Sequence, residues 1–258
     1  MRLSIVQSAL VWENKAENLR RFDQKLAPLG GQTDLVVLPE MFSTGFSMKA
    51  ELLAERMDGA TMIWLAEKAA QLGASIAGSF ICRENDQHYN RLVWMRPDGT
   101  FETYDKRHLF SLAEEEKHFA PGHKRLIVNW NGFAVCPMIC YDLRFPAWSR
   151  NRRDETGYDL LIYVANWPTR RAHHWRSLLQ ARAIENQAYC VGVNIVGTDG
   201  NGLEYVGDSA IVDFLGQHIC QLSAQEGVFT TELSLQNLHN YRAQFPFLAD
   251  ADKFQFEY

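Results

Sequence analysis

The chain has 258 residues and a formal net charge of −5, with 47% hydrophobic and 22% charged residues. This length suits one large domain or two small ones, and the apolar fraction is high enough to form a buried core. Because no basic surface dominates the composition, we expect no nucleic-acid partner. The N-terminal segment lacks the continuous apolar stretch of a signal peptide, and no run approaches the roughly 20 apolar residues of a membrane span. We therefore expect a soluble, cytoplasmic protein.

The first half of the chain alternates strand-like and helix-like patterns. In chain order, these patterns predict a strand over 2–10, a helix over 14–30, a strand over 33–40, a helix over 59–73 and a strand over 74–83. A hairpin is predicted over 87–110, because two strand patterns flank the turn signal Pro97-Asp98-Gly99.

The second half continues in the same manner. It predicts strands over 132–140 and 157–168, a helix over 173–190 that runs into a strand over 190–197, and a hairpin over 209–220. No linker or repeat divides the chain. The mixture of βα units and hairpins favours an α/β protein with a two-layer sheet core and helices outside, as a single domain over 1–258.

Five cysteines are spread irregularly along the chain, and no CxxC pair occurs among them: Cys82, Cys136, Cys140, Cys190 and Cys220. This spacing indicates neither a disulfide framework nor a zinc site. Reduced thiols fit a cytoplasmic protein, and most of them should be small buried side chains.

Four predicted strands end at polar or reactive residues, namely Glu40, Lys106, Cys140 and Asn166. Because ligand sites in open α/β sheets lie at the carboxyl ends of strands, we expect these side chains to lie near one pocket.

Cys140 is a candidate nucleophile if a neighbouring group accepts its proton. None of the eight histidines stands at a predicted strand end, whereas Glu40 emerges from an apolar run and could act as the base. The Lys106 ammonium would favour a thiolate and stabilise an oxyanion. Each residue alone also has an ordinary structural interpretation: a loop carboxylate, a charge in a solvated run and a core thiol.

Four segments resemble the signature segments of the nitrilase superfamily of carbon–nitrogen hydrolases, and they occur in the same order: "LVVLPEMF", "YDKRHLF", "CYDLRFP" and "RAIENQAY". The form "CYDLRFP", with "KRHLF" upstream, resembles the omega-amidase branch. True nitrilases carry Trp-Glu after the cysteine, where this chain has Tyr141-Asp142.

The resemblance implies a four-layer α-β-β-α sandwich and a Glu40-Lys106-Cys140 catalytic triad. It also implies a second glutamate, which matches Glu115 in "EEKHFAPG", with Glu114 and Glu116 as alternatives of shifted register. Hydrolysis would pass through a cysteine thioester, with the oxyanion held by Lys106 and the backbone N–H of Tyr141. No metal or cofactor is implied.

The implied substrates are the terminal amides of 2-oxoglutaramate and 2-oxosuccinamate, which carry a carboxylate. Candidate carboxylate ligands are Arg144, Arg170 and Arg171, because an arginine fork suits a carboxylate. We expect the pocket walls to include Phe42, Phe110, Tyr141, Asn166 and Trp167. Ordinary packing would explain any one of these aromatic residues, and ion pairing within the protein would explain Arg144.

Two segments are candidates for an interface in a homodimer or a higher homo-oligomer, a helix over 144–153 and the helical segment 173–187, although packing onto the chain's own sheet explains the same pattern. Alternative functions are another amidase or an N-carbamoyl hydrolase of the same superfamily, a true nitrilase, and a non-catalytic scaffold. The scaffold is disfavoured because it has no need of the three triad residues together.

Overall fold

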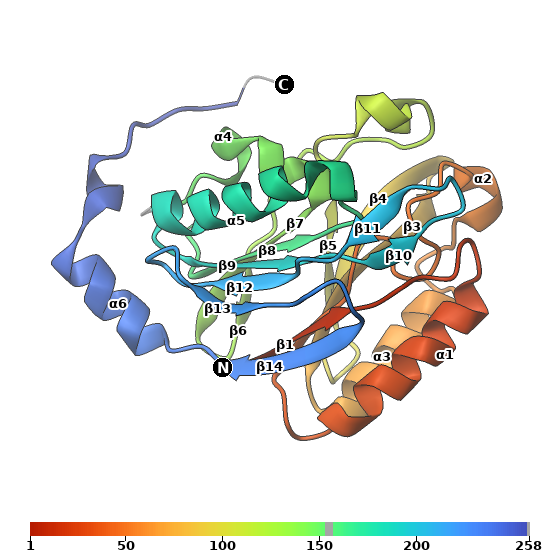
Figure 1. The fold of residues 1–258 in the computed structure, drawn as a ribbon, viewed down its shortest axis with the longest axis horizontal. Helices are drawn as coiled ribbons and strands as arrows, with labels where there is room; N and C mark the ends of the chain where they lie inside the picture. Colours follow the sequence, from red (N-terminus) through yellow and green to blue (C-terminus); the bar gives the residue numbers. More distant parts are fainter. Residues whose placement is uncertain (153–156, 257–258) are drawn as a thin grey trace.

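Two six-stranded sheets packed face to face form the centre of the computed structural model, which describes residues 1–152 and 157–256 (Figure 1). The first sheet consists, in spatial order, of β14 (Gly227–Glu232), β1 (Arg2–Gln7), β2 (Leu35–Val37), β3 (Ser75–Glu84), β4 (Gln87–Met95) and β5 (Phe101–Asp105). Within this sheet, β1, β2 and β3 are parallel to one another. The outer pairs, β14 with β1, β3 with β4 and β4 with β5, are antiparallel.

The second sheet repeats this arrangement. It consists, in spatial order, of β13 (His218–Gln221), β12 (Ala210–Val212), β9 (Tyr189–Val193), β8 (Leu160–Val164), β7 (Phe133–Ile139) and β6 (Val128–Trp130). The central strands β7, β8 and β9 are parallel to one another. Each sheet therefore has a parallel centre, whose strand ends can carry a ligand site.

Helices cover the outer face of each sheet (Figure 1). The helices α1 (Lys15–Leu26) and α3 (Ala60–Leu72) lie on the first sheet, and α5 (Ala172–Asn186) and the short α4 (Pro146–Ser149) lie on the second. A Cβ at Gly192 of β9 would lie 2.4 Å from Leu179 of α5, so glycine permits this close approach. The four-layer α-β-β-α sandwich is as expected.

The central strands are buried on both faces, which explains their continuous apolar runs. In β1, Leu3 and Ile5 belong to the core between the sheets, whereas Val6 packs with α1 and α3. In β2, Leu35 and Val37 point between the sheets and Val36 points to the helices.

Several elements differ from the expectation. The strand predicted over 33–40 ends at Val37, and the helix predicted over 144–153 is reduced to Pro146–Ser149, with Arg153 outside the described residues. Phe145, with φ −112° and ψ 89°, precedes the proline that starts this helix, and the chain leaves the helix at Arg150.

Six further elements had not been predicted as such: the edge strands β6 and β14, α2 (Ala50–Leu53), helix α6 (Leu235–Gln244), and the separate hairpin of β10 (Val196–Thr198) and β11 (Glu204–Val206). Their sequences are short or largely polar, so the apolar period is weak.

Within the described part of the chain, every helix is too short or too polar to cross a membrane.

Candidate active site

Cys140 stands at a sharp turn between β7 and the 3-10 helix η4 (Cys140–Arg144). Its φ of 41° lies in the left-handed region, which costs a non-glycine residue about 1–3 kcal/mol and persists where the surroundings impose it. Here the Asp142 carboxylate accepts a hydrogen bond from the backbone N–H of Ile139 at 3.1 Å and closes the turn. The thiol is thereby exposed to a cavity instead of continuing the alternation of the strand.

Glu40 lies three residues after β2 and is fully buried. The following residue, Met41, has a φ of 42°, and its N–H donates to Ser79 Oγ at 2.9 Å. Glu40 Oε1 accepts from Asn90 Nδ2 at 2.8 Å, and Oε2 accepts from the backbone N–H of Asn166 at 2.8 Å. The orientation of this carboxylate is therefore fixed from both sheets.

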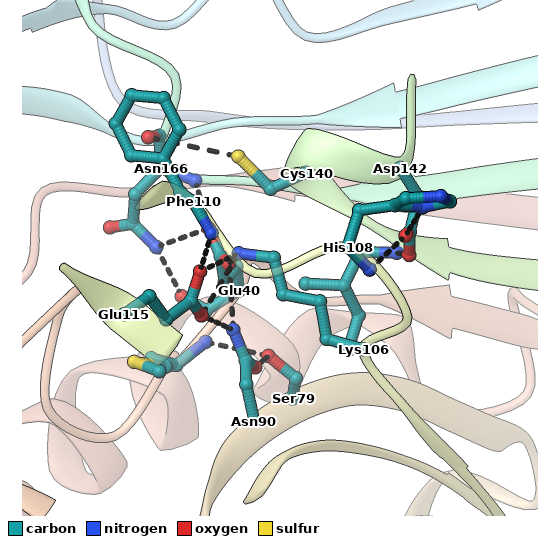
Figure 2. A network of polar contacts seen from close by, with 12 residues as sticks. Glu40, Ser79, Asn90, Lys106, His108, Phe110, Glu115, Cys140, Asp142 and Asn166 are labelled. Carbon is teal, nitrogen blue, oxygen red and sulfur yellow. Dashed lines mark hydrogen bonds and ion pairs between the residues drawn. The ribbon is translucent and has the colours of Figure 1, made fainter. Parts of the chain in front are cut away.

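Lys106 follows β5 directly and joins the two buried glutamates (Figure 2). Its Nζ lies 2.9 Å from Glu40 Oε1 and 3.1 and 2.9 Å from the two oxygens of Glu115. The side chains of all three residues have no exposed surface. Such a pair of carboxylates around one ammonium keeps a positive charge in place inside the protein.

Glu115, and not its neighbours, occupies the site. Glu115 Oε2 also accepts from the backbone N–H of Phe110 at 2.6 Å. Glu114 is exposed and pairs with Lys117 at 2.5 Å, and Glu116 is exposed as well. The structure thus selects the predicted register, and the catalytic role of Glu115 stays a prediction.

The charges of this cluster shift the pKa of Lys106 and of Glu115. Burial lowers the pKa of Lys106, but the charges of Glu115 and Glu40 outweigh it and raise the pKa overall. Burial raises the pKa of Glu115 against the opposing effect of Lys106, and Glu40 raises it further. Lys106 therefore remains an ammonium at neutral pH.

Lys106 lowers the pKa of the Cys140 thiol, as expected, but other groups act on this pKa as well. Burial and the negative charge of Glu40 raise the pKa of Cys140 well above its usual value, and the attraction of Lys106 offsets only part of this. The sulfur lies 4.0 Å from the backbone carbonyl oxygen of Asn166 (Figure 2). The resting nucleophile is consequently a thiol, which must give up its proton as it reacts.

A cavity of about 280 Å³ opens at Cys140. Its wall includes nine residues singled out from the sequence: Lys106, Phe110, Cys140, Tyr141, Arg144, Asn166, Trp167, Arg170 and Arg171. The gathering of strand-end residues is therefore as expected, with the qualification that Glu40 and Asn166 lie in the turns that follow their strands.

The expectation for Phe42 was wrong. Its ring is fully buried on the other side of the first sheet, 5.6 Å from the Phe22 ring and 5.8 Å from the Trp64 ring. The left-handed turn at Met41 directs it there, and Gly78 makes room, because a Cβ at that position would lie 3.0 Å from the Phe42 ring. Phe42 belongs to the core between sheet and helices.

Three arginines line the same cavity as Cys140. The Arg144 guanidinium lies 4.8 Å from the centre of the Trp167 ring, and the Arg171 guanidinium lies 5.2 Å from the centre of the Phe110 ring. Burial lowers the pKa of Arg171, and the neighbouring Arg170 and Arg144 lower it further. Among the residues that the structure describes, none of the three arginines has a carboxylate partner. Asp199 also lines the cavity, so three guanidinium groups stand against one carboxylate among these lining residues.

Four polar residues of the site had not been predicted as such: Ser79, Asn90, Asp142 and Tyr205. Asn90 is a fully buried polar side chain within β4, and its Oδ1 accepts from Ser79 Oγ at 2.9 Å. Tyr205 of β11 lines the cavity, and its hydroxyl donates to Asp199 at 2.9 Å. A polar residue inside an apolar strand was the available signal for Asn90, whereas Tyr205 carried none.

Across residues 1–152 and 157–256, no three His, Cys, Asp or Glu side chains are grouped so that they could hold a metal ion.

Comparison with known proteins identifies the family. The model of the carbon–nitrogen hydrolase family matches residues 2–243. The chain belongs to this family. The expectation of a nitrilase-superfamily fold and of an amide-hydrolysing enzyme is thereby confirmed.

Relatives match over nearly the full length. The omega-amidase YafV of Escherichia coli is 45% identical over 99% of this chain and 98% of its own. The 2-oxoglutaramate amidase of Bacillus subtilis is 31% identical over 97% of both chains. The crystal structure of XC1258 from Xanthomonas campestris, a CN-hydrolase superfamily protein with an arsenic adduct in the active site, is 47% identical and covers 100% of this chain and 99% of its own, with a TM-score of 0.98.

Proposed function

We propose that this chain is an omega-amidase, which hydrolyses the terminal amide of 2-oxoglutaramate or 2-oxosuccinamate to the 2-oxo dicarboxylic acid and ammonia. Full-length relatives at 45% and 31% identity are named omega-amidase and 2-oxoglutaramate amidase. The observation that carries the proposal is the arrangement of one cavity: a cysteine beside a buried Glu–Lys–Glu cluster, and three arginines without carboxylate partners among the described residues.

The arginines suit the distal carboxylate of such a substrate. A guanidinium binds a carboxylate in a bidentate manner, and the contacts with Trp167 and Phe110 preorganise Arg144 and Arg171. The same charges disfavour an ammonium group. Glutamine has an ammonium where 2-oxoglutaramate has an uncharged oxo group, so the cavity should prefer the oxo acid amide.

The first half-reaction forms a thioester. Glu40 takes the proton of Cys140 as the sulfur attacks the amide carbon, and the C=O bond becomes an oxyanion. The Lys106 ammonium and the backbone N–H of Tyr141 stabilise this oxyanion, and a donor of this kind contributes about 3 kcal/mol to the barrier reduction. Glu40 then passes its proton to the amide nitrogen, the C–N bond breaks, and ammonia leaves.

The second half-reaction regenerates the enzyme. Glu40 removes a proton from a water molecule, whose oxygen attacks the thioester carbon, and the same donors hold the second oxyanion. The C–S bond breaks, the sulfur recovers a proton from Glu40, and the carboxylic acid leaves. Glu115 acts on Lys106 and keeps it charged and in place.

The test is ammonia release from a panel of amides, with Cys140→Ala as the blank. The panel contains 2-oxoglutaramate, 2-oxosuccinamate, glutamine, asparagine, an N-carbamoyl amino acid and a simple nitrile. Preference for the two oxo acid amides supports the proposal. Preference for the N-carbamoyl amino acid, which also carries a carboxylate, would keep the site chemistry and replace the omega-amidase function by that second candidate.

We also propose a cytoplasmic homodimer. The five cysteines are free thiols, which suits a reducing compartment. On α5, Ile184 is 50% exposed and lies against Gly216, whose chain neighbour Leu215 is 49% exposed, so apolar side chains face outward here. Light scattering at micromolar concentration should give twice the chain mass, and Ile184→Glu should shift it toward the monomer. A monomer mass for the unaltered protein would contradict the dimer.

A further inference from the structure

The Asp142 side chain is a fully buried acceptor two residues after Cys140. Its Oδ2 accepts from the backbone N–H of Ile139 at 3.1 Å and from the Tyr104 hydroxyl at 2.7 Å. Its Oδ1 accepts from the backbone N–H of His108 at 3.0 Å and lies 2.8 Å from His108 Nδ1. Because a carboxylate only accepts, this Nδ1 carries the proton.

These donors come from both sheets. Ile139 ends β7 of the second sheet, and Tyr104 belongs to β5 of the first. The Tyr104 hydroxyl also accepts from Trp148 Nε1 at 3.0 Å and from the backbone N–H of Arg107 at 3.3 Å. One carboxylate therefore connects the turn before the nucleophile with the segment that follows the lysine.

The connected segments are those that carry Cys140 and Lys106 (Figure 2). Lys106 is followed by Arg107 and His108, whose N–H groups bind the Tyr104 hydroxyl and Asp142 respectively. Cys140 lies between Ile139 and Asp142, which bind each other. A small shift of the turn at Asp142 would therefore move the thiol relative to the ammonium.

We propose that Asp142 is a positioning residue that holds Cys140 and Lys106 at a fixed separation across the two sheets. This role rests on the proposed function, because it assigns the thiol and the ammonium to one reaction. It acts on the chemical step: a displaced ammonium stabilises the oxyanion less, whereas Arg171, which lies on the separate segment Thr169–Arg171, keeps its place at the substrate carboxylate.

Asp142→Asn tests this role with little change in shape. An amide has one acceptor and one NH₂ group, and in either orientation the NH₂ meets a backbone N–H, of Ile139 or of His108. We expect kcat to fall by about 100-fold, because a displacement of about 1 Å has an effect of this size, and KM to stay within about threefold of the wild-type value.

Asp159→Asn is the matched control. Asp159 is 9% exposed and also connects separate segments, since it accepts from the backbone N–H of Ala134 at 3.0 Å and from Arg242 at 2.7 Å. Both variants should lower the thermal midpoint, but Asp159→Asn should keep kcat per folded molecule. If Asp142→Asn also lowers only the midpoint, or raises KM at unchanged kcat, Asp142 is not a positioning residue for this step.

Two further measurements apply if Asp142→Asn does not fold or if no amide of the panel is hydrolysed. Tyr104→Phe removes one donor to Asp142 and should lower kcat about tenfold at unchanged KM.

Alkylation of Cys140 by iodoacetamide, followed against pH, requires no substrate. We expect its midpoint to move in Tyr104→Phe and Asp142→Asn and to stay in Asp159→Asn. Unmoved midpoints in all three would reject the positioning role, and failure of the panel alone would reject only the omega-amidase function.

Discussion

Asn166 and Glu40 are joined by three hydrogen bonds that cross from one sheet to the other, of which the longest, from Asn166 Nδ2 to Glu40 Oε2, measures 3.5 Å. The Asn166 backbone N–H donates to Glu40 Oε2 at 2.8 Å, and Asn166 Nδ2 donates to the Glu40 carbonyl oxygen at 2.6 Å. Asn166 follows β8 of the second sheet, and Glu40 follows β2 of the first. The proposed base is therefore oriented by the same turn that presents a carbonyl oxygen to the Cys140 sulfur.

Asn166→Asp should nearly abolish turnover. The new carboxylate would face the Glu40 carbonyl oxygen and lie near its carboxylate, where the amide now donates, so acceptors would oppose one another in a buried site. Ammonia release should fall by at least about 100-fold. Asn240→Asp on the exposed side of α6 adds the same charge and should leave the rate unchanged. Equal activity of the two variants would refute the orienting role of Asn166.

Glu115→Gln should lower kcat without unfolding the protein. The amide keeps an acceptor for Lys106 but removes a negative charge that raises the pKa of Lys106 and holds the ammonium. A loss of about 10- to 100-fold in kcat corresponds to weakening one electrostatic contact to the transition state. The neighbour Glu116 is exposed, so Glu116→Gln is the control and should be neutral. A fall of kcat in Glu116→Gln, with none in Glu115→Gln, would show that Glu115 is not the glutamate that supports catalysis.

The Cys140 pKa predicts how alkylation depends on pH. Because burial and Glu40 raise this pKa, the thiolate fraction and the iodoacetamide rate should keep rising beyond about pH 9. Glu40→Gln removes one of the causes that raise the pKa. It should therefore speed alkylation several-fold at fixed neutral pH while nearly abolishing amide hydrolysis.

This opposite response separates two roles of Glu40. If Glu40→Gln slows alkylation as well, Glu40 acts as a base toward the reagent, and its charge does not control the thiol. The Cys140→Ala protein, digested and mapped, shows how much label enters the other four cysteines, of which Cys82, Cys136 and Cys190 are buried.

Arg171→Met should impair recognition of the substrate carboxylate. The guanidinium is half-buried over Phe110 in the cavity wall, and methionine keeps the bulk without the charge. KM for 2-oxoglutaramate should rise by at least about tenfold, and KM for a neutral amide should hardly change. Arg176→Met is the control, because Arg176 pairs with Asp208 and is not among the residues that line the cavity. A similar rise for both amides would reject Arg171 as the carboxylate ligand.

The sequence was sufficient to predict the strands, the main helices and the strand-end residues, because these follow from apolar period and from the ends of parallel strands. Cys140, Lys106 and Asn166 were all expected at one pocket, and all three line it. The bounds were less accurate. Glu40 was expected at a strand end but lies in a turn three residues beyond β2.

The prediction for Phe42 was wrong because the position of this side chain depends on a backbone turn that leaves no periodic signal in the sequence. The left-handed residue Met41 reverses the side-chain alternation, and Phe42 therefore points into the core instead of the cavity. The raised pKa of Cys140 was not predicted for another reason: the effect of Lys106 in favour of the thiolate was visible from the sequence, whereas the degree of burial was not. Tyr205 lies on a short hairpin whose sequence is mostly polar.

The most direct test of the proposed chemistry is to look for the covalent intermediate. 2-Oxoglutaramate is mixed with the enzyme, quenched in acid within the first turnovers, and examined by intact-mass and peptide mass spectrometry. We expect a five-carbon acyl group on Cys140 in the wild type, more of it when hydrolysis of the thioester is slowed, and neither adduct nor ammonia with Cys140→Ala. Ammonia release at the wild-type rate by Cys140→Ala, with no adduct in either protein, would contradict nucleophilic catalysis at this residue.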